Sequence, residues 1–501
     1  MAAAVALGWG GLAGCGGRPS VSASRSTLAA TFADPVGDGM LRRASGESLV
    51  DRTELHPSAP EGGQLALLAQ ITDAHLVDPR SPARLEVLHR LGPPFESTYR
   101  PQEALTPRIL AAAVTALDGY PLDAVLDTGD LVDNNQANEL GQALGALDGG
   151  RIDPGARLPA YDGVQAAADP DPGYYRPDVD PPRHPGLLAS AQAPFASSGL
   201  HAPWFPVAGN HDLLVGGILA ATPQTERLAT GNRRIVALPP GLRLGGAVPA
   251  ELTGAALDGR PRAAALVDGL LASGHLGQTA PVAPDPGRRE LGPGGAVDRL
   301  RAASALGGGL GASAGTTRVS ALGPAGTLSY GVDVGDRVRV IALDAVSRAG
   351  GSGGTLSGPQ LGWLGDELRR AGSRWVIVLS HQPLAGFASG RRALALLDAD
   401  PRVLAAVAGH THRNSIAPRR SPAGGYWLIT TASLIDYPQQ ARILRVVATA
   451  GGGVALETWM QDTAPDPLAD TARELAFLDA EGGRPGGFAG GRLDRNVRLF
   501  R

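Results

Sequence analysis

Short apolar runs recur along the chain and are the clearest pattern in its order of hydrophobic and polar positions. Residues 65–71 form the first run, and several later ones are rich in the β-branched residues that pack well in sheets. Helical patterns lie between some of the runs, and strands alternating with helices are typical of an α/β fold. The remaining predicted strands are residues 124–127, 204–208, 338–343, 375–379, 403–408, 427–431, 442–448 and 454–459.

Three segments are predicted to be helical. Residues 104–117 contain a Thr-Pro pair near their start. Residues 357–370 begin at Ser357, a residue type that caps helices, and end just before Gly372, a residue type that stops them. The third segment, residues 466–478, is charged and lies close to the end of the sequence.

Two long stretches interrupt the alternation. Residues 148–200 are rich in proline and aspartate, and residues 213–325 are rich in glycine, alanine and arginine. Loops of this length inside a domain are usually functional or disordered. The pattern predicts one folded domain with two insertions at residues 64–460, after a leader and flexible tether at 1–63 and before a C-terminal helix and tail at 461–501.

The composition supports long loops and excludes some kinds of chemistry. Glycine and proline account for 70 and 41 of the 501 residues, whereas the aromatic residues make up only 4%. The formal net charge of −3 provides no basic field for nucleic acid, so we expect no nucleic-acid partner. All 45 basic residues are arginine, which excludes a P-loop lysine and a Schiff-base lysine.

The single cysteine, Cys15, excludes an intramolecular disulfide and a multi-cysteine zinc site. It ends the tetrapeptide Leu-Ala-Gly-Cys after an apolar stretch, which resembles the lipobox of bacterial lipoproteins. No basic residue precedes Cys15, so the charged start of a signal peptide is missing from this sequence. We expect an extracytoplasmic protein attached to a membrane through lipidated Cys15. The alternative is a small-residue N-terminus with an incidental buried cysteine.

Polar clusters directly follow five of the predicted strands. Because open α/β sheets place ligands at the carboxyl ends of their strands, we expect these clusters to meet in one crevice. Two of them contain residue pairs spaced two apart, whose side chains point the same way from an extended backbone. The clusters are Asp73-Ala74-His75, Gly129-Asp130-Leu131-Val132-Asp133, Gly209-Asn210-His211-Asp212, Ser380-His381-Gln382 and Gly409-His410-Thr411-His412.

The residue types in these clusters suit a pair of divalent metal ions. Two ions about 3.5 to 4 Å apart need a bridging carboxylate, neutral imidazoles and an amide oxygen. The glycines Gly129, Gly209 and Gly409 precede the candidate ligands and permit sharp turns close to the ions. The candidate ligands are Asp73, His75, Asp130, Asn210, His381, His410 and His412.

The five clusters, in this order, resemble the motifs of the calcineurin-like metallophosphoesterase superfamily. The motifs are Asp-x-His, Gly-Asp-x-x-Asp, Gly-Asn-His-Asp, His and Gly-His-x-His, and the long insertions are similar to those of an exported bacterial subgroup. The resemblance covers the strand-forming segments between residues 65 and 460. It implies a catalytic domain of four layers, in which two mixed β-sheets pack as a sandwich flanked by helices, with long loop insertions.

The same resemblance implies a role for each site residue. His211 is the implied general acid, oriented by Asp212, with Asp133 behind the metal ligands. The implied reaction is hydrolysis of a phosphate ester by a hydroxide that bridges two divalent ions of manganese, iron or zinc. One ion is expected at Asp73, His75, Asp130 and His412, and the other at Asp130, Asn210, His381 and His410.

Departures from the family patterns narrow the expected substrate. Purple acid phosphatases have tyrosine where this chain has Asp133, and protein phosphatases have Arg-Gly where it has Asn134-Asn135. The sequence is closer to bacterial phosphodiesterases, so we expect a phosphodiester substrate. The alternatives are a phosphomonoesterase or nucleotidase of the same superfamily, an anchored binding protein with a vestigial metal site, and metal-independent hydrolysis. The second insertion begins directly after Asp212, which suggests that it covers the metal cleft as a lid.

Overall fold

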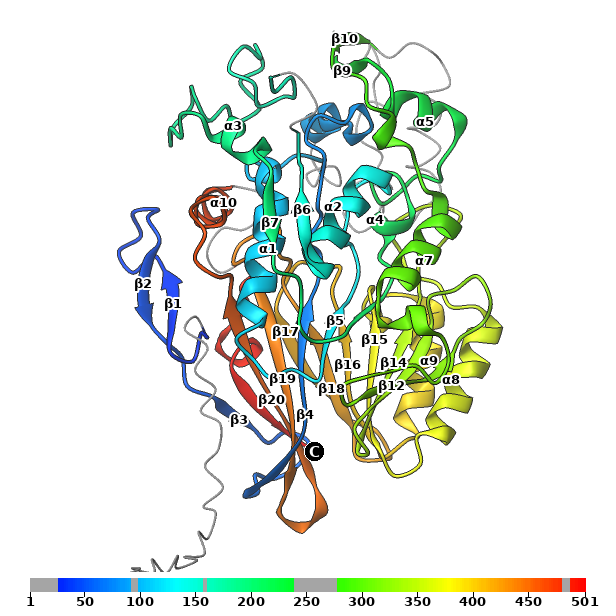
Figure 1. Ribbon diagram of the computed structural model, residues 1–501. Coiled ribbons are helices and arrows are strands. Elements are labelled where there is room, and N and C mark those ends of the chain that lie inside the picture. The colour runs from blue at the N-terminus through cyan, green and yellow to red at the C-terminus, as the bar shows by residue number, and fades with distance from the viewer. Residues whose placement is uncertain (1–25, 92–97, 156–159, 238–276, 480–486) are drawn as a thin grey trace, which may run out of the picture.

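The protein has two large mixed β-sheets with helices on their outer sides (Figure 1). The computed structural model describes residues 26–91, 98–155, 160–237, 277–479 and 487–501. Within these residues the strands form a seven-stranded sheet, an eight-stranded sheet and three two-stranded sheets. This arrangement confirms the predicted α/β fold class of two mixed sheets flanked by helices.

The seven-stranded sheet brings three of the predicted polar clusters to one edge. Strands β4, β5 and β8 run parallel, and their last residues Ile71, Asp127 and Pro206 are in register. The loops after these strands therefore begin side by side. The strand order is β3 (Val50–Arg52), β21 (Val497–Phe500), β20 (Val454–Asp462), β19 (Gln440–Thr449), β4 (Glu61–Ile71), β5 (Ala124–Asp127) and β8 (Trp204–Pro206).

The eight-stranded sheet does the same for the other two clusters. Its strands β14, β15, β16 and β18 are parallel, with Leu379 paired to Val407 just before the loops that carry the histidines. Its order is β11 (Ser313–Ala314), β12 (Thr317–Leu322), β13 (Tyr330–Val334), β14 (Val338–Leu343), β15 (Trp375–Ser380), β16 (Val403–Ala408), β18 (Tyr426–Thr430) and β17 (Ser415–Arg419).

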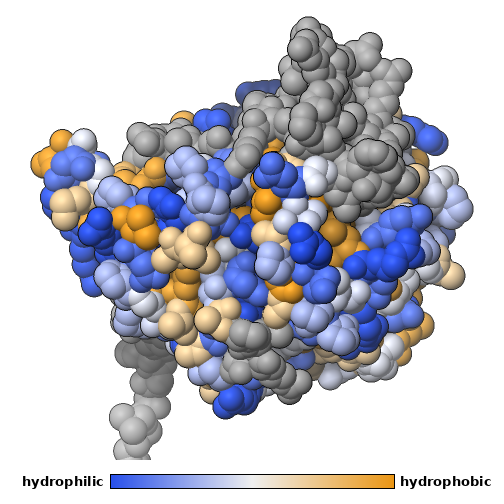
Figure 2. All heavy atoms as spheres, turned by 90° about the horizontal axis from the view of Figure 1, so that it is seen from above, coloured by the Kyte–Doolittle hydropathy of each residue, from blue (hydrophilic) through white to orange (hydrophobic). Residues whose placement is uncertain are grey.

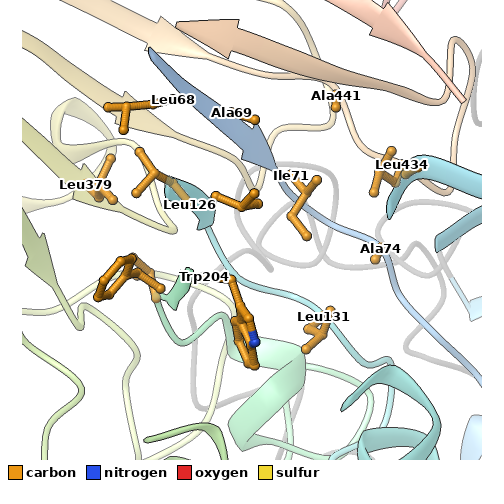
Figure 3. Close-up of a cluster of buried hydrophobic side chains, with 14 of the residues drawn as sticks. Leu68, Ala69, Ile71, Ala74, Leu126, Leu131, Trp204, Leu379, Leu434 and Ala441 are labelled. Atoms are coloured by element: carbon orange, nitrogen blue, oxygen red, sulfur yellow. The ribbon is translucent and has the colours of Figure 1, made fainter. Parts of the chain in front are cut away.

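Apolar side chains from both sheets form one continuous core between them (Figure 3). Leu126 of β5 and Leu379 of β15 belong to this core, and the rings of Phe205 and Tyr330 lie 6.2 Å apart across it. Burying each large aliphatic side chain contributes about 1.5–3 kcal/mol relative to leaving it exposed. The packing of the two sheets thus fixes where their strand ends lie relative to each other.

Helices cover the outer faces of both sheets. Helices α8 (Gly358–Arg370) and α9 (Ala388–Asp398) bury their apolar sides against the eight-stranded sheet. Helix α1 (Thr106–Leu117) contacts β20 and packs between α2 (Ala137–Asp148) and α10 (Pro467–Leu478). Helix α8 begins as predicted, because Ser357 and Gln360 form a reciprocal capping box of the kind that contributes about 1 kcal/mol.

Both ends of the described chain differ from the predicted tether and tail. Strands β1 (Ala30–Ala33) and β2 (Arg42–Ser45) form a hairpin, and β3 pairs in parallel with β21 inside the seven-stranded sheet. Short strands of this kind form because tertiary pairing supplies hydrogen bonds that local sequence does not signal. Cys15 lies outside the described residues, so its lipidation and export stay predictions. Among the residues described, no helix is long and apolar enough to cross a membrane.

The two insertions lie at the upper end of the molecule in Figure 1. The first contains β6 (Gly150–Ile152), α3 (Leu187–Gln192) and β7 (Phe195–Ser197). The second ends earlier than predicted, because β11 and β12 belong to the eight-stranded sheet. Figure 2 views this end from above and shows hydrophilic and hydrophobic residues intermixed on its described surface. The described part of the second insertion also contains α5 (Pro223–Ala229), β9 (Arg233–Ala237), β10 (Gln278–Pro281) and α7 (Gly292–Ala303).

Candidate metal centre

The five polar clusters meet where the two sheets present their strand ends. Backbone hydrogen bonds join the loops: the Asp73 N–H donates to the Gly129 carbonyl over 2.9 Å, and the Gly409 N–H donates to the His381 carbonyl over 3.1 Å. The His410 N–H also donates to the Asp73 carboxylate over 3.0 Å, which links a loop of one sheet to a loop of the other. All seven predicted metal ligands lie in this cluster of loops.

Three of these ligands form one group, which we call the Asp73 group: Asp73, His75 and His412. The Nε2 atoms of the two histidines are 3.2 Å apart, and Asp73 Oδ1 lies 3.3 Å from His412 Nε2 and 3.9 Å from His75 Nε2. One ligand atom from each residue therefore faces a common point, as a metal ion requires.

A second set, which we call the Asn210 group, comprises Asn210, His381 and His410. His381 Nε2 lies 3.1 Å from Asn210 Oδ1 and 3.2 Å from His410 Nδ1. Asn210 Nδ2 donates to the Gly217 carbonyl over 3.1 Å, which directs the amide oxygen toward the centre. Residue 217 belongs to the start of the second insertion, so that segment touches the centre, while closure as a lid stays a prediction.

Asp130 lies between the two groups. Its Oδ2 atom is 3.0 Å from His381 Nε2 and 3.7 Å from His75 Nε2, and its Oδ1 atom accepts the His211 N–H over 2.7 Å. One oxygen is thus held by the start of the short helix α4 (Asn210–Leu213), and the other is left to face both groups. This is the position that a bridging carboxylate needs.

The donor set fits two divalent cations. Asp73 and Asp130 are both buried, and among the described residues no arginine forms an ion pair with either of them. Buried carboxylates need a compensating positive charge. A mixture of imidazole nitrogen, carboxylate oxygen and amide oxygen suits manganese, iron or zinc.

Electrostatics in the metal-free centre favour protons where a cation would bind. Although burial opposes the charge, Asp130 and Asp73 raise the pKa of His381 to about 10. Burial likewise opposes charge on His412, but Asp73 and Asp436 raise its pKa to about 9. Burial and the neighbouring His211 lower the pKa of His75 to about 4. A metal ion that binds here must therefore displace protons.

The backbone at the ligands differs from the extended conformation that their spacing suggested. Each affected residue lies within a few residues of a strand end and has a left-handed backbone conformation. A left-handed residue other than glycine costs on the order of 1 kcal/mol, and strain of this kind clusters at functional sites. The residues and φ angles are Asp73 51°, His75 42°, Asp130 53°, His410 68° and His412 55°.

The three predicted glycines are needed for close approach. Gly129 has a φ of 96°, a conformation that side chains disfavour. A Cβ atom on Gly209 would overlap the backbone nitrogen and carboxylate of Asp130, and one on Gly409 would overlap Thr72 and the carboxylate of Asp73. This confirms the expectation that glycines bring the loop backbones close to the ligands.

Asp212 does not contact the imidazole of His211 as its expected role of orienting that ring requires. Its carboxylate accepts the N–H groups of Gly209 at 2.8 Å and of Asp130 at 2.9 Å, and those of the next two residues after Asp130 at 2.9 and 3.2 Å. The imidazole of His211 instead contacts Asp133, with Nδ1 2.8 Å from the carbonyl oxygen. Asp212 therefore holds the loop that carries Asp130, because its place in α4 directs it toward backbone donors.

Sequence reasoning missed Asp436, which lies directly behind a ligand. Its Oδ2 atom is 2.5 Å from His412 Nδ1. Asp133, which was predicted to lie behind the ligands, occupies the matching place at His75, with 2.9 Å between Oδ1 and Nδ1. The only signal for Asp436 was an acidic residue a few positions after a predicted strand, without a motif around it.

Comparisons with known proteins found solved structures that are similar to this chain. No family model matches the sequence, and no curated protein matches it either. A dimetal phosphatase from Danio rerio is similar in structure, with 13% sequence identity and a TM-score of 0.39. The similarity covers 80% of this chain and 97% of that one.

Proposed function

We propose that the protein is a two-metal-dependent phosphoesterase that prefers phosphodiesters. The observation that carries the proposal is the convergence of seven candidate nitrogen and oxygen ligands on one centre, with Asp130 between the two groups. Two adjacent divalent cations supply positive charge for a phosphoryl group and lower the pKa of water. The surrounding residues hold the two cations, and His211 supplies a proton.

His211 is placed to protonate the leaving oxygen. Its Nδ1 atom faces the Asp133 carbonyl, which can only accept, so Nδ1 carries a proton and Nε2 is the nitrogen that exchanges one with a substrate. A Cβ atom on Gly217 would overlap His211 Nε2, so glycine at this position keeps the space beside that nitrogen open. His211 then transfers a proton from Nε2 to the departing oxygen.

The charges behind the ligands support a diester over a monoester. A phosphomonoester carries nearly two negative charges at neutral pH, whereas a diester carries one. The buried arginines Arg84 and Arg100 are bonded to Asp133 and Asp436 behind the histidines, so their charge is directed away from a substrate phosphate. A phosphate with a single negative charge needs less positive charge from the rest of the site to balance it. A phosphomonoesterase or nucleotidase remains the alternative.

Hydrolysis of an aryl phosphodiester and of the matching monoester by manganese-loaded protein tests the proposal. We expect Asp130→Asn to lower activity by at least about a thousandfold, because a metal centre supplies several kcal/mol to the transition state. Asp127→Asn is the matched control. Burial and Asp212 raise the pKa of Asp127 well above its ordinary value, which disfavours the charged form that the amide lacks.

The outcomes separate the alternatives. Full activity of Asp130→Asn, or activity that survives complete chelation, would overturn two-metal hydrolysis. A higher rate on the monoester would replace the diester preference with the monoesterase alternative. Wild-type protein that purifies without metal and takes up none would support the anchored binding protein with a vestigial site.

A further inference from the structure

A buried turn after Asp133 lies between His211 and the second insertion. Its residue Asn135 is fully buried and is not among the predicted site residues. Asn135 has a φ of 57°, a left-handed conformation that asparagine adopts more readily than most other residues. Such a conformation persists only where the surrounding structure holds it. The contacts of Asn135 must therefore offset its cost.

The side chain of Asn135 holds the short helix that carries His211. Its Nδ2 atom donates to the carbonyl of Asp212, which follows His211 in α4. The imidazole of His211 is held from the same turn, because its Nδ1 atom lies 2.8 Å from the Asp133 carbonyl oxygen. Residues 133 and 135 therefore fix both the ring of His211 and the backbone next to it.

The second insertion holds Asn135 from the other side. Asn135 Oδ1 accepts the N–H of Gly292 over 2.8 Å, and the Asn135 carbonyl accepts the N–H of Leu291 over 3.0 Å. Gly292 is the first residue of α7, where N–H groups lack partners within the helix. Because the amide oxygen and the amide nitrogen serve different partners, the orientation of the Asn135 side chain is fixed.

The residue before Asn135 anchors the same turn to α2. The Asn134 N–H donates to Glu139 Oε2 over 2.8 Å, and Asn134 Nδ2 donates to Glu139 Oε1 over 3.0 Å. Asn134 and Asn135 are thus two buried asparagines of one turn, and their amide nitrogens bond to different helices. This difference provides a matched control for a test of Asn135.

The metal ligands near α4 have anchors of their own. Asn210 Nδ2 donates to the Gly217 carbonyl, and the Asp212 carboxylate accepts the N–H groups of residues 130–132. These bonds do not involve Asn135, so its loss should loosen His211 more than the ligands. A proton donor must lie within hydrogen-bond reach of its acceptor, and a misplacement of about 1 Å can lower a rate about 100-fold.

We propose that Asn135 is a positioning residue that holds α4 so that His211 Nε2 reaches the departing oxygen of the substrate. When the bond from phosphorus to this oxygen breaks, the oxygen keeps the electron pair and takes the proton from Nε2. The inference rests on the proposed function, but it concerns protonation of the leaving group and not metal-dependent hydrolysis. Residues 291 and 292 of the second insertion keep Asn135 in place for this role.

Hydrolysis of diphenyl phosphate and of bis(nitrophenyl) phosphate by the manganese-loaded full chain tests this role in Asn135→Gly. Glycine accepts the left-handed backbone but removes both side-chain bonds. We expect kcat to fall about 10- to 100-fold on the phenyl ester, because phenolate is basic and needs a proton. On the nitrophenyl ester the loss should be less than about threefold, because nitrophenolate departs without one. Metal content, measured by elemental analysis, should equal that of the wild type.

Asn134→Gly is the matched control, because it removes a buried amide of the same turn that bonds to α2. We expect any loss of activity in this variant to be equal on the two esters. A loss in Asn134→Gly that is larger on the phenyl ester, as in Asn135→Gly, would overturn the specific role of the bond between Asn135 and α4.

A second variant keeps the test decisive if Asn135→Gly folds poorly. In Asn135→Asp, an ionised carboxylate keeps an acceptor for Gly292 but cannot donate to the Asp212 carbonyl. We expect the same larger loss on the phenyl ester. Unchanged rates, equal losses on both esters or loss of metal in a folded variant of either kind overturn the role of Asn135, while hydrolysis by the wild type still stands. Wild-type protein that hydrolyses neither ester overturns both this inference and the proposed function.

Discussion

The two sheets contribute different chemistry to the centre. Loops of the seven-stranded sheet supply both carboxylates, the amide, one histidine ligand and His211, whereas loops of the eight-stranded sheet supply only the imidazoles of His381, His410 and His412. Neither set alone offers the mixture that a divalent pair needs. The centre therefore exists only when the sheets are packed, and metal binding and packing of the sandwich should depend on each other.

Replacing one histidine from each sheet should cause the largest losses of activity. We expect His410→Ala to lose metal and at least about a thousandfold in activity, because it removes a ligand. His211→Ala should keep both ions and lose about 100- to 10,000-fold, because it removes only the proton donor. Activity on esters with several leaving groups and metal content measure the difference.

The dependence of activity on the leaving group is the control for the His410→Ala and His211→Ala variants. A variant without its proton donor should be slowest on poor leaving groups and closest to wild type on nitrophenolate, which departs without protonation. An equal loss on all leaving groups would contradict the role of His211. Loss of metal from His211→Ala would show that this histidine is a ligand instead.

Removing the metals should weaken the packing of the two sheets. A ligand present at a hundred times its dissociation constant stabilises the folded state by about 2.7 kcal/mol, so two ions at that level should contribute about 5 kcal/mol. We expect a lower melting temperature in chelator than in excess manganese, measured by circular dichroism. The same melting temperature in both conditions would contradict coupling between metal and sandwich.

We expect pH to have a smaller effect, which acts through the histidines of the metal centre. The pKa values of His381 and His412, about 10 and about 9, are raised above the ordinary 6.5, so both carry protons at neutral pH in the metal-free protein. Their contribution to metal-free stability is fully present below about 6.5 and is lost as the pH rises through about 9 and 10.

Metal affinity should change in the opposite direction. Each proton that a cation displaces raises the apparent affinity by about tenfold per pH unit, and the rise should level off once the histidines deprotonate. Competition against a metal indicator between about pH 6 and about pH 8 measures the slope. A flat profile would contradict protonated histidines in the metal-free centre.

The local sequence predicted the elements that carry the centre well. Strands β5, β14 and β16 have the predicted bounds, because each is a short, mainly apolar run whose residues are all buried. The sequence indicated the seven candidate ligands in a similar way, since each lies within a few residues of a strand end. The motif order also predicted that these loops would meet.

Other features depended on contacts between distant segments. Asp436 has no motif, and it lies 24 positions from His412 in the sequence. Strands β3 and β21 form only because the two chain ends pair with each other, and Asp212 turned toward backbone donors instead of the imidazole of His211. Patterns of three or four residues carry no information about such pairings.

The sequence by itself determined which side chains are available to bind two cations and which strands deliver them, because alternating burial and strand-end clusters are local properties. Only the tertiary structure decided how those side chains are held. An ion-pair network behind His75 and His412 joins residues 84, 100, 103, 133 and 436, and the attraction between its charges is strong only where burial excludes water. Packing of the two sheets provides that burial.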